Sequence, residues 1–210
     1  MYRVKDFIEK DQNEILGFME ANPFMTLIGV RDGMPAVTQV PVMIAVSDGT
    51  ITLTGHVMKS TDHHKAISAN PEVMVLFQGP GCYVSSSWYS ERGHGATWNY
   101  MTVQARGAVE LLDSHETLDI LKALTHHFEK GREPQELVEN MTEAYISGNL
   151  KAITGFRIRL QDVQAVFKLS QNRDDASYYN IVKKLQQEKQ AGANFIAAEM
   201  IKRRPHLFAE

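Results

Sequence analysis

The chain has 210 residues, of which 43% are hydrophobic and 22% are charged, and its formal net charge at pH 7 is −3. A chain of this length can bury the core of one elaborated domain, and the composition is that of an ordinary soluble globular protein. The slight negative charge excludes an overall attraction to nucleic acid, and no apolar run approaches the roughly 20 residues that span a bilayer. The first ten residues lack the apolar core of a secretion signal, and the single cysteine, Cys82, excludes an internal disulfide framework. We therefore expect a cytoplasmic protein with no membrane segment.

The first part of the chain predicts one helix followed by strands. Asn22-Pro23 ends the helix, because a residue before proline avoids helical geometry. Asp32-Gly33 and Asp48-Gly49 are strong signals for tight hairpin turns, so we expect the strands beside them to form an antiparallel meander. The expected elements are a helix over 11–22 and strands over 24–30, 35–46 and 51–55.

A short helix then interrupts the strands. Thr61 or Asp62 can cap it, and it is expected to end at Asn70-Pro71. A short helix set between strands suggests a small barrel rather than a flat sheet. The strands expected after it cover 72–79, 82–89 and 96–111.

From Ser114 the chain becomes mostly helical. Ser114 is the expected cap of a helix that stops at Gly131, and Pro134 suits the first turn of the next helix. The expected elements are helices over 114–130 and 133–148, a strand over 152–169, and helices over 174–190 and 193–204. The sequence therefore predicts the α+β class, with a β-rich centre and helices on its flanks.

Residues 83–107 contain both tryptophans of the chain, together with tyrosines and three consecutive serines. A flavin or another flat cofactor needs apolar walls and a few placed polar groups, which such a stretch could supply. The alternative is that the tryptophans are core or interface residues and the serines lie on a strand edge. Strand alternation places Trp98 and Tyr100 on one face and Asn99 and Met101 on the other. These side chains therefore cannot all line one pocket without another strand or a second subunit.

Other chemistry-bearing patterns are weaker. The spacing of His56, Asp62, His63 and His64 matches no standard zinc pattern, so we expect no metal site. The sequence has no G-x-S-x-G elbow of a serine hydrolase and no G-x-G-x-x-G of a dinucleotide fold. Lys65, on a short helix beside a barrel mouth, could neutralise a phosphate.

The stretch FKLSQNR, residues 167–173, places Lys168 and Arg173 on either side of polar residues at a strand end. One interpretation is an anion site, because arginine can fork onto a phosphate. The other is a turn that leads into the last helices, with Asp174 or Asp175 as the helix cap. The basic residues near the C-terminus show no coherent helix-turn-helix, so DNA binding has no support from charge.

Together these segments resemble the PaiB family of FMN-binding, negative transcriptional regulators. That family's signature has a GP-x-x-Y-I-S-P-S-W-Y element, then P-T-W-N-Y, then a late K-L-S-Q-N-R. The opening "MY" with Phe7, and "HHKAISANP", are similar to further family landmarks, and the resemblance covers about residues 1–175. The segments that match the signature here are Gly79-Pro80, Tyr83 to Tyr89, Thr97 to Tyr100, and Lys168 to Arg173.

The PaiB family is similar in turn to the wider group of flavin-binding split barrels that includes pyridoxamine phosphate oxidases. In that group two subunits pack their barrels and bind FMN at the shared interface. The resemblance therefore implies an antiparallel split β-barrel with flanking helices, FMN as the cofactor, and a homodimer with the cofactor site at the subunit interface. VQARG, residues 103–107, looks like that group's Q-x-R-x-G strand. A dimer would also let the two faces of the aromatic strand serve different subunits.

The resemblance implies a cofactor pocket with a phosphate site, a ring site and a mouth. Thr52, Thr54 and Lys65 would lie near the phosphate, and Gln104 would contact the polar edge of the ring. The tryptophans and the asparagine would lie near the ring or the second subunit, and a lysine and an arginine at the mouth would offer an anionic substrate a site. The remaining cofactor-binding candidates are Ser85, Trp88, Trp98, Asn99, Lys168 and Arg173.

The sequence departs from the family pattern at several positions. Ser86 and Ala96 stand where the family usually has proline, and Val4 replaces another typical proline. The stretch HVMKSTDHHKAISANP is longer than the family's compact histidine-to-NP stretch. Either His56 or His64 can therefore correspond to the family histidine.

Three functions remain open at this point: an FMN-binding negative transcriptional regulator, a flavin-dependent oxidoreductase acting on a small substrate, and a cofactor-free member of the family. Whether the protein is an enzyme is thus left open. For the domain organisation, we expect an FMN-binding split-barrel domain over residues 1–175, with a helical insertion at about 114–148. Residues 176–210 are expected to form a C-terminal helical extension.

Overall fold

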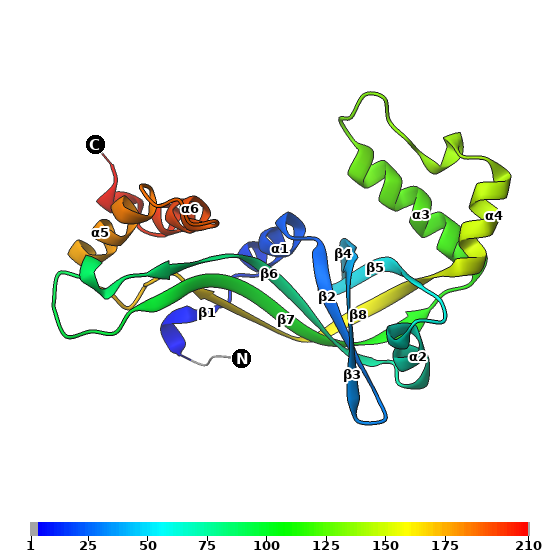
Figure 1. Ribbon diagram of the computed structural model, residues 1–210, viewed down its shortest axis with the longest axis horizontal. Coiled ribbons are helices and arrows are strands. Elements are labelled where there is room, and N and C mark those ends of the chain that lie inside the picture. Colours follow the sequence, from blue (N-terminus) through cyan, green and yellow to red (C-terminus); the bar gives the residue numbers. More distant parts are fainter. Residues whose placement is uncertain (1–3, 210) are drawn as a thin grey trace. The chain divides into compact units, whose positions relative to one another are not determined.

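The computed structural model describes residues 4–209, and Figure 1 shows strands flanked by helices in this part of the chain. Met1 and Tyr2, which form the landmark "MY", lie outside the described residues. The predicted α+β class is confirmed. The helices are α1 (Gln12–Ala21), α2 (Asp62–Ala69), α3 (Ser114–Glu129), α4 (Glu143–Ala152), α5 (Asp175–Leu185) and α6 (Ala193–Arg203). The strands are β1 (Ile8–Glu9), β2 (Phe24–Arg31), β3 (Met34–Pro41), β4 (Met43–Ser47), β5 (Thr50–Met58), β6 (Glu72–Val84), β7 (Thr97–Leu111) and β8 (Ile153–Lys168).

The strands of residues 4–209 form one sheet in the order β3-β2-β6-β7-β8-β5-β4, with β1 paired to β8. The predicted meander is wrong, because β3 pairs with β2 whereas β4 pairs with β5. The run predicted as one strand over 35–46 is divided at Val42. Pro41 has no N–H with which to continue a ladder, and the N–H of Val42 instead bonds the carbonyl oxygen of Pro23 at 3.0 Å.

Both predicted hairpin turns are confirmed. The φ angles are 53° and 75° at Asp32 and Gly33, and 49° and 75° at Asp48 and Gly49. Positive φ at both central residues is the property of a type I′ turn, which matches the right-handed twist of the strands that it joins. The two Asp-Gly pairs therefore set the β2–β3 and β4–β5 hairpins.

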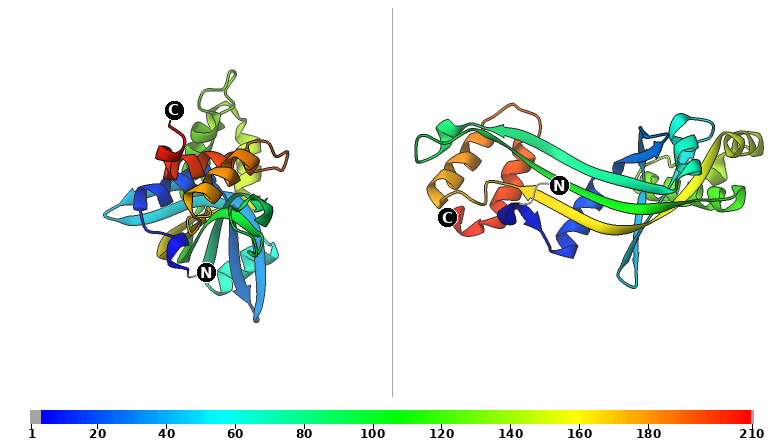
Figure 2. Two further views of the ribbon diagram at one scale, coloured as in Figure 1. Left: turned by 90° about the vertical axis from the view of Figure 1, so that its left-hand side faces the viewer. Right: turned by 90° about the horizontal axis from the view of Figure 1, so that it is seen from below.

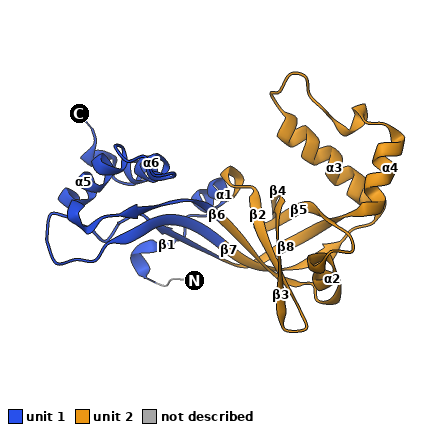
Figure 3. Ribbon diagram, in the orientation of Figure 1, with its two compact units in different colours: residues 1–18, 78–103, 164–210 blue, residues 19–77, 104–163 orange. Residues whose placement is uncertain are grey.

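The chain forms two compact units, drawn in two colours in Figure 3. The strands β6, β7 and β8 each contribute residues to both units, so neither unit is one continuous stretch of sequence. The predicted boundary after residue 175 and the predicted insertion stay predictions. Unit 1 consists of Met1–Phe18, Gln78–Val103 and Gln164–Glu210, and unit 2 consists of Met19–Phe77 and Gln104–Val163.

In unit 2, β5 packs closely against both β8 and β3. A Cβ atom on Gly55 would lie 2.8 Å from the ring of Phe156 and 2.9 Å from the carbonyl oxygen of Pro41, so a larger residue does not fit there. Since β3 and β5 are not neighbours in the strand order, this contact joins two separate parts of the sheet, as a barrel requires. The fully buried side chains of this unit include Met25, Leu27, Leu53, Val75, Phe77, Phe156 and Ile158.

In unit 1, α5 and α6 lie side by side, as the orange and red helices of Figure 2 show. The buried hydroxyl of Tyr178 donates a hydrogen bond to the carbonyl oxygen of Met200 at 2.9 Å. Burial raises the pKa of Tyr178 to about 12, so this hydroxyl stays a donor at neutral pH. The other fully buried side chains of this unit include Phe167, Leu169, Ile181, Leu185 and Ile196.

Two predicted helix starts are wrong. The cap of α3 is Asp113 and not Ser114, because the Asp113 carboxylate accepts a hydrogen bond from a backbone N–H of the first turn at 2.9 Å. The helix predicted over 133–148 begins only at the start of α4, where Thr142 supplies a capping hydroxyl that a glutamate before Pro134 does not. None of the helices within residues 4–209 is long and apolar enough to cross a membrane.

Candidate functional site

Two of the predicted phosphate-site residues lie on one face of β5. Thr52 and Thr54 are half-buried and alternate with the buried Leu53, so their hydroxyls share the face opposite the core. In the antiparallel pairing of β5 with β8, Thr52 lies opposite Arg159 and Thr54 lies opposite Arg157. Side chains of directly opposed residues lie on the same face of a sheet. Two hydroxyls and two guanidinium groups are therefore presented together.

The third strand of this surface is β7. Glu110 of β7 and Arg157 of β8 form an ion pair at 2.9 Å, which places the Glu110 side chain on the same face as the two threonines. Gln104 and Arg106 lie at even intervals from Glu110 in a strand with regular alternation, and so they share its face. We call the surface of Thr52, Thr54, Gln104, Arg106 and Arg159 the open face of unit 2.

The arginines around the open face differ in their electrostatic partners. Arg157 is paired with Glu110 and Glu116, and hydrogen bonding to Glu110 is the main cause that raises its pKa. Arg106 and Arg159 are exposed, and neither forms an ion pair within residues 4–209. The open face therefore presents two positive charges that no carboxylate of residues 4–209 neutralises, beside hydroxyl groups that can donate to an anion.

Lys65 lies on a different element of unit 2. It belongs to α2, which packs on β2 and β3, and its ammonium is 4.0 Å from the carboxylate of Asp62. The predicted cap of this helix is confirmed, since Thr61 accepts a hydrogen bond from the backbone N–H of His64. The other candidate for the family histidine, His56, lies on β5. The role of Lys65 near a phosphate stays a prediction.

The remaining predicted site residues belong to unit 1. We call residues 83–103 of this unit the aromatic segment. Lys168 donates hydrogen bonds to the Thr97 hydroxyl and, at 2.8 Å, to the carbonyl oxygen of Trp98, and its ammonium lies 5.3 Å from the centre of the Phe7 ring. Burial is the main cause that lowers the pKa of Lys168, and the nearby Arg173 adds to it. Lys168 thus joins the end of β8 to the start of β7.

The predicted alternation of the aromatic segment is confirmed. Asn99 and Met101 are buried, whereas Trp98 is 54% exposed. Asn99 is held by Ser170: its amide nitrogen donates to the Ser170 hydroxyl at 3.0 Å, and that hydroxyl lies 3.1 Å from the amide oxygen. On the outer face, the rings of Tyr83 and Trp98 are in edge contact, with centres 6.3 Å apart. The asparagine is therefore part of the interior, and the tryptophan is available at the surface.

The serine and arginine candidates of unit 1 form local contacts. The Ser85 hydroxyl accepts a hydrogen bond from the Ser87 N–H at 3.2 Å and caps the short turn that contains the half-buried Trp88. The guanidinium of Arg173 lies 4.0 Å from the centre of the buried Tyr89 ring. Such a stacked arginine is held in place by its aromatic partner.

The predicted turn after β8 is confirmed in one of its two interpretations. Asp174 caps α5, and its carboxylate accepts hydrogen bonds from the N–H and the hydroxyl of Ser177 at 2.9 and 2.7 Å and from the Ser90 hydroxyl at 3.2 Å. These hydrogen bonds, led by the one from the Ser177 N–H, lower the pKa of Asp174 to about 2. Asp174 therefore ties α5 to Ser90 within the aromatic segment.

Sequence reasoning thus found three residues of the open face and missed two. Thr52, Thr54 and Gln104 are brought to one face, whereas Arg106 and Arg159 were not among the candidates. Arg106 has a signal in VQARG, which resembles the Q-x-R-x-G strand and contains this arginine. Arg159 stands between buried residues of β8, and only the pairing of the strands shows that it shares a surface with the threonines. Within residues 4–209, no three histidine, cysteine or carboxylate side chains gather in a way that could hold a metal ion.

Residues 1–162 match the protein family described as "Putative FMN-binding domain". This chain belongs to that family. It is also similar to "Protease synthase and sporulation protein PAI 2" of Bacillus subtilis (strain 168), with 34% identity over 200 residues that cover 95% of this chain and 96% of that protein. The resemblance to the PaiB family is therefore confirmed.

Solved structures of flavin proteins share the fold of this family member. One is the flavocytochrome Anf3 from Azotobacter vinelandii, with a TM-score of 0.61, 14% identity, and coverage of 80% of this chain and 72% of that chain. Another is the FAD and heme binding protein from Mycobacterium smegmatis, with a TM-score of 0.58, 19% identity, and coverage of 77% of this chain and 73% of that chain. At these identities the likeness concerns the fold alone, and the predicted split-barrel fold is confirmed.

Proposed function

We propose that this family member binds FMN with its phosphate at the open face of unit 2, works as a homodimer, and acts as an FMN-dependent negative regulator of transcription. The observation that carries the proposal is the group formed by Thr52, Thr54 and Arg159, in which an exposed guanidinium that has no ion pair in the described part of the chain stands beside two hydroxyls. The family of the chain and the flavins named for two proteins of the same fold support the choice of FMN.

The residues of the open face fit the phosphate of FMN in kind and in charge. A guanidinium can donate two parallel hydrogen bonds to a phosphate, and a threonine hydroxyl can donate a third. A hydrogen bond to a charged group contributes about 1.5–3 kcal/mol, so Arg159 alone accounts for roughly ten- to a hundredfold in affinity. Arg106 adds a second positive charge on the same face.

The isoalloxazine ring needs contacts besides those of the phosphate. When bound, FMN supplies a flat ring that accepts and releases electrons. In the proposed complex Gln104 contacts the polar edge of the ring. The exposure of Trp98 and its edge contact with Tyr83 support a surface role for this pair.

The homodimer has support from exposed apolar side chains of β2 and β3. Phe24, Val30 and Val37 lie on one face of the β2–β3 hairpin and are exposed to 65%, 43% and 54%, and exposed apolar side chains that gather on neighbouring strands mark interaction surfaces. A second copy of the chain would cover them. Sedimentation equilibrium should give twice the mass of the chain, and a monomer at micromolar concentration would contradict this part of the proposal.

The regulatory role rests on the family, and the oxidoreductase alternative has lost part of its support. Lys168 and Arg173, which were expected to receive an anionic substrate, are engaged within unit 1 by hydrogen bonds and by the ring of Tyr89. A regulator should bind its operator DNA with an affinity that falls steeply with salt and changes with FMN. Reduction of the bound flavin by NADH or NADPH, with reoxidation by a substrate, would favour the enzyme.

The test of the cofactor site compares FMN with riboflavin, which has the same ring but no phosphate. We expect wild-type protein to bind FMN at least roughly ten- to a hundredfold more tightly than riboflavin, and Arg159→Gln to narrow this gap. Arg132→Gln is the matched control, because Arg132 is also an exposed arginine of unit 2 and its partner is Glu129 on α3. Equal affinity for the two flavins in wild-type protein would contradict the phosphate site.

A further inference from the structure

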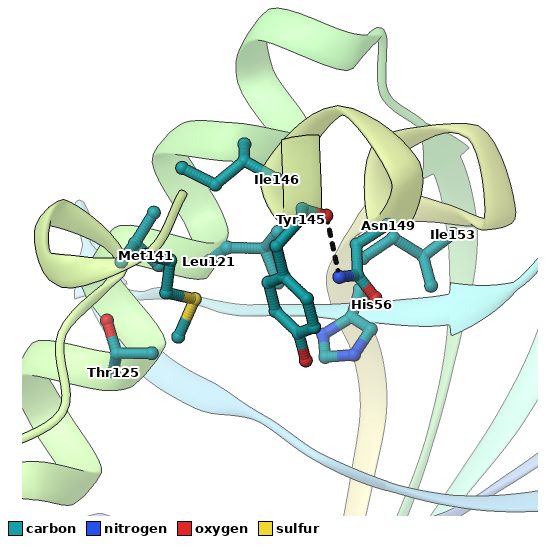
Figure 4. Close-up of a pocket in the computed structure, with 9 residues that line it drawn as sticks. His56, Leu121, Thr125, Met141, Tyr145, Ile146, Asn149 and Ile153 are labelled. Carbon is teal, nitrogen blue, oxygen red and sulfur yellow. Dashed lines mark hydrogen bonds between the residues drawn. The ribbon is translucent and has the colours of Figure 1, made fainter. Parts of the chain in front are cut away.

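A cavity lies in unit 2, where α3 and α4 cover the ends of β5 and β8. Its volume is about 180 Å³, and Figure 4 shows the side chains that line it. The wall is mostly apolar, with Leu121 from α3, Met141 from the connecting loop and Ile146 from α4. A cavity lined in this way favours an apolar ligand, because water in it would find few hydrogen-bonding partners.

One wall of the cavity carries a polar atom without a partner. His56 lines the cavity from β5, and its Nδ1 is buried and accepts no hydrogen bond from residues 4–209. In Figure 4 its ring lies beside Tyr145 and Asn149. The Asn149 amide nitrogen donates one hydrogen bond to the carbonyl oxygen of Tyr145 at 2.9 Å, and none of its hydrogen bonds within residues 4–209 goes to Nδ1 of His56. The histidine nitrogen is thus the polar atom that a ligand must satisfy.

The neutral imidazole of His56 can accept a hydrogen bond from a ligand. Burial lowers the pKa of the imidazole, which keeps the ring neutral at pH 7. A neutral imidazole with its proton on Nε2 has a free lone pair on Nδ1. A buried acceptor that stays unbonded costs free energy, so a ligand with an N–H or O–H at this place would gain affinity from it.

The size of the cavity limits the ligand. An engineered apolar cavity of about 150 Å³ holds benzene, whereas pockets that enclose drug-sized ligands have volumes of about 300–1,000 Å³. This cavity therefore fits one or two small rings and is too small for FMN. The inference goes beyond the proposed function and does not depend on it.

We propose that the cavity between α3, α4 and β5 binds one small, uncharged molecule of one or two aromatic rings, which donates an N–H or O–H hydrogen bond to Nδ1 of His56. Leu121, Met141 and Ile146 contact the ring system, and His56 selects ligands with a donor over hydrocarbons of the same shape.

The experiment uses indole and indene, two probes of similar shape of which only indole has an N–H. Their affinities for the full-length protein are measured by NMR titration, with the nitrogen resonances of histidine side chains as the readout. We expect both to bind, indole roughly two- to tenfold more tightly, and indole to shift the Nδ1 resonance of His56. The absence of saturable binding of both probes, or equal affinities without a shift at His56, would overturn the proposal.

Variants separate the donor site from the cavity. His56→Leu should bind indene as before and lose the preference for indole, whereas His115→Leu, which removes an exposed histidine of α3 outside the cavity, should keep it. Leu121→Trp should fill the cavity and abolish binding of both probes. If that variant does not fold, Ile146→Phe takes its place. A preference for indole that survives His56→Leu, or binding that survives a folded filled variant, would refute the site.

Discussion

The aromatic segment of unit 1 and the open face of unit 2 use their polar side chains in opposite ways. In the aromatic segment Asn99 is bonded to Ser170, and Lys168 is bonded to backbone and hydroxyl oxygens. On the open face Arg106 and Arg159 have no ion pair within the described chain. The aromatic segment, which carries much of the family signature, therefore makes internal bonds, whereas two arginines of the open face have no ion pair within residues 4–209.

The difference shows that a family signature and a binding surface need not be the same residues. A buried amide or ammonium group must be paired inside the protein, which restricts the residue at that position as strongly as ligand binding does. Exposed arginines are common on strands, so the sequence alone does not mark one as part of a binding surface. The residues paired with it across the sheet show whether it belongs to one. The predictions below, in order of decreasing effect, test whether this division holds.

The largest effect is expected in the aromatic segment. Asn99→Leu removes a fully buried amide and leaves the Ser170 hydroxyl without its partner, and we expect a loss of about 1–3 kcal/mol in the free energy of unfolding. Urea denaturation measures it. Asn172→Leu is the control, because Asn172 is exposed in the turn between β8 and α5, and it should change the free energy of unfolding by less than about 0.5 kcal/mol. An unchanged midpoint in Asn99→Leu would show that the buried pair is not structural.

A smaller, pH-dependent effect is expected at Asp174. Its pKa of about 2 in the folded protein lies below the ordinary 3.8, so its hydrogen bonds stabilise the fold at neutral pH, and this contribution is lost as the pH falls from about 4 to 2. Asp174→Asn should therefore be less stable than wild-type protein at pH 7 and approach it near pH 2. Asp6→Asn is the control, because Asp6 is exposed and its carboxylate forms no ion pair within residues 4–209. A stability difference that is constant over this range would contradict the assignment.

In unit 2 the pH dependence concerns His56. Because burial lowers its pKa in the folded state, the unfolded chain binds the proton more readily, and stability falls as the pH drops below about 6.5. His56→Leu should flatten this part of the stability–pH curve, whereas His115→Leu should not. Urea denaturation at several pH values between 7.5 and 5 measures the slope, and an identical slope in His56→Leu would show that the buried histidine does not titrate in this way.

The smallest effect on stability is expected on the open face. Arg159→Gln removes no ion pair within residues 4–209, so its free energy of unfolding should stay within about 0.5 kcal/mol of wild-type protein. Thermal unfolding without FMN measures this. A large loss would mean that Arg159 has a structural role like that of Lys168, and the contrast between the two regions would disappear.

Local features of the fold were predictable from the sequence, and long-range pairing was not. The Asp32-Gly33 and Asp48-Gly49 turns were found because positive φ angles favour these residues, and Thr61 was found because its hydroxyl can cap a helix. The order of the strands depends on contacts between distant segments, which no local pattern shows. The break between β3 and β4 at Val42 had one local sign, the proline at position 41, and this sign alone did not predict the break.

The candidate site was predictable in the same partial way. Thr52, Thr54 and Gln104 came from the family resemblance, and the structure brings them to one face. Arg159 could not be chosen in advance, because only the pairing of β5 with β8 places it opposite Thr52. The cavity beside His56 was likewise unpredictable, since it depends on how α3 and α4 pack on the sheet.

A crystal structure of the protein with FMN tests the central claim most directly, because it locates the phosphate. The account predicts that the phosphate lies within hydrogen-bonding distance of the Arg159 guanidinium and of the hydroxyl of Thr52 or Thr54. A phosphate bound at Lys168 or Arg173 in unit 1, with the open face of unit 2 free of FMN, would contradict it.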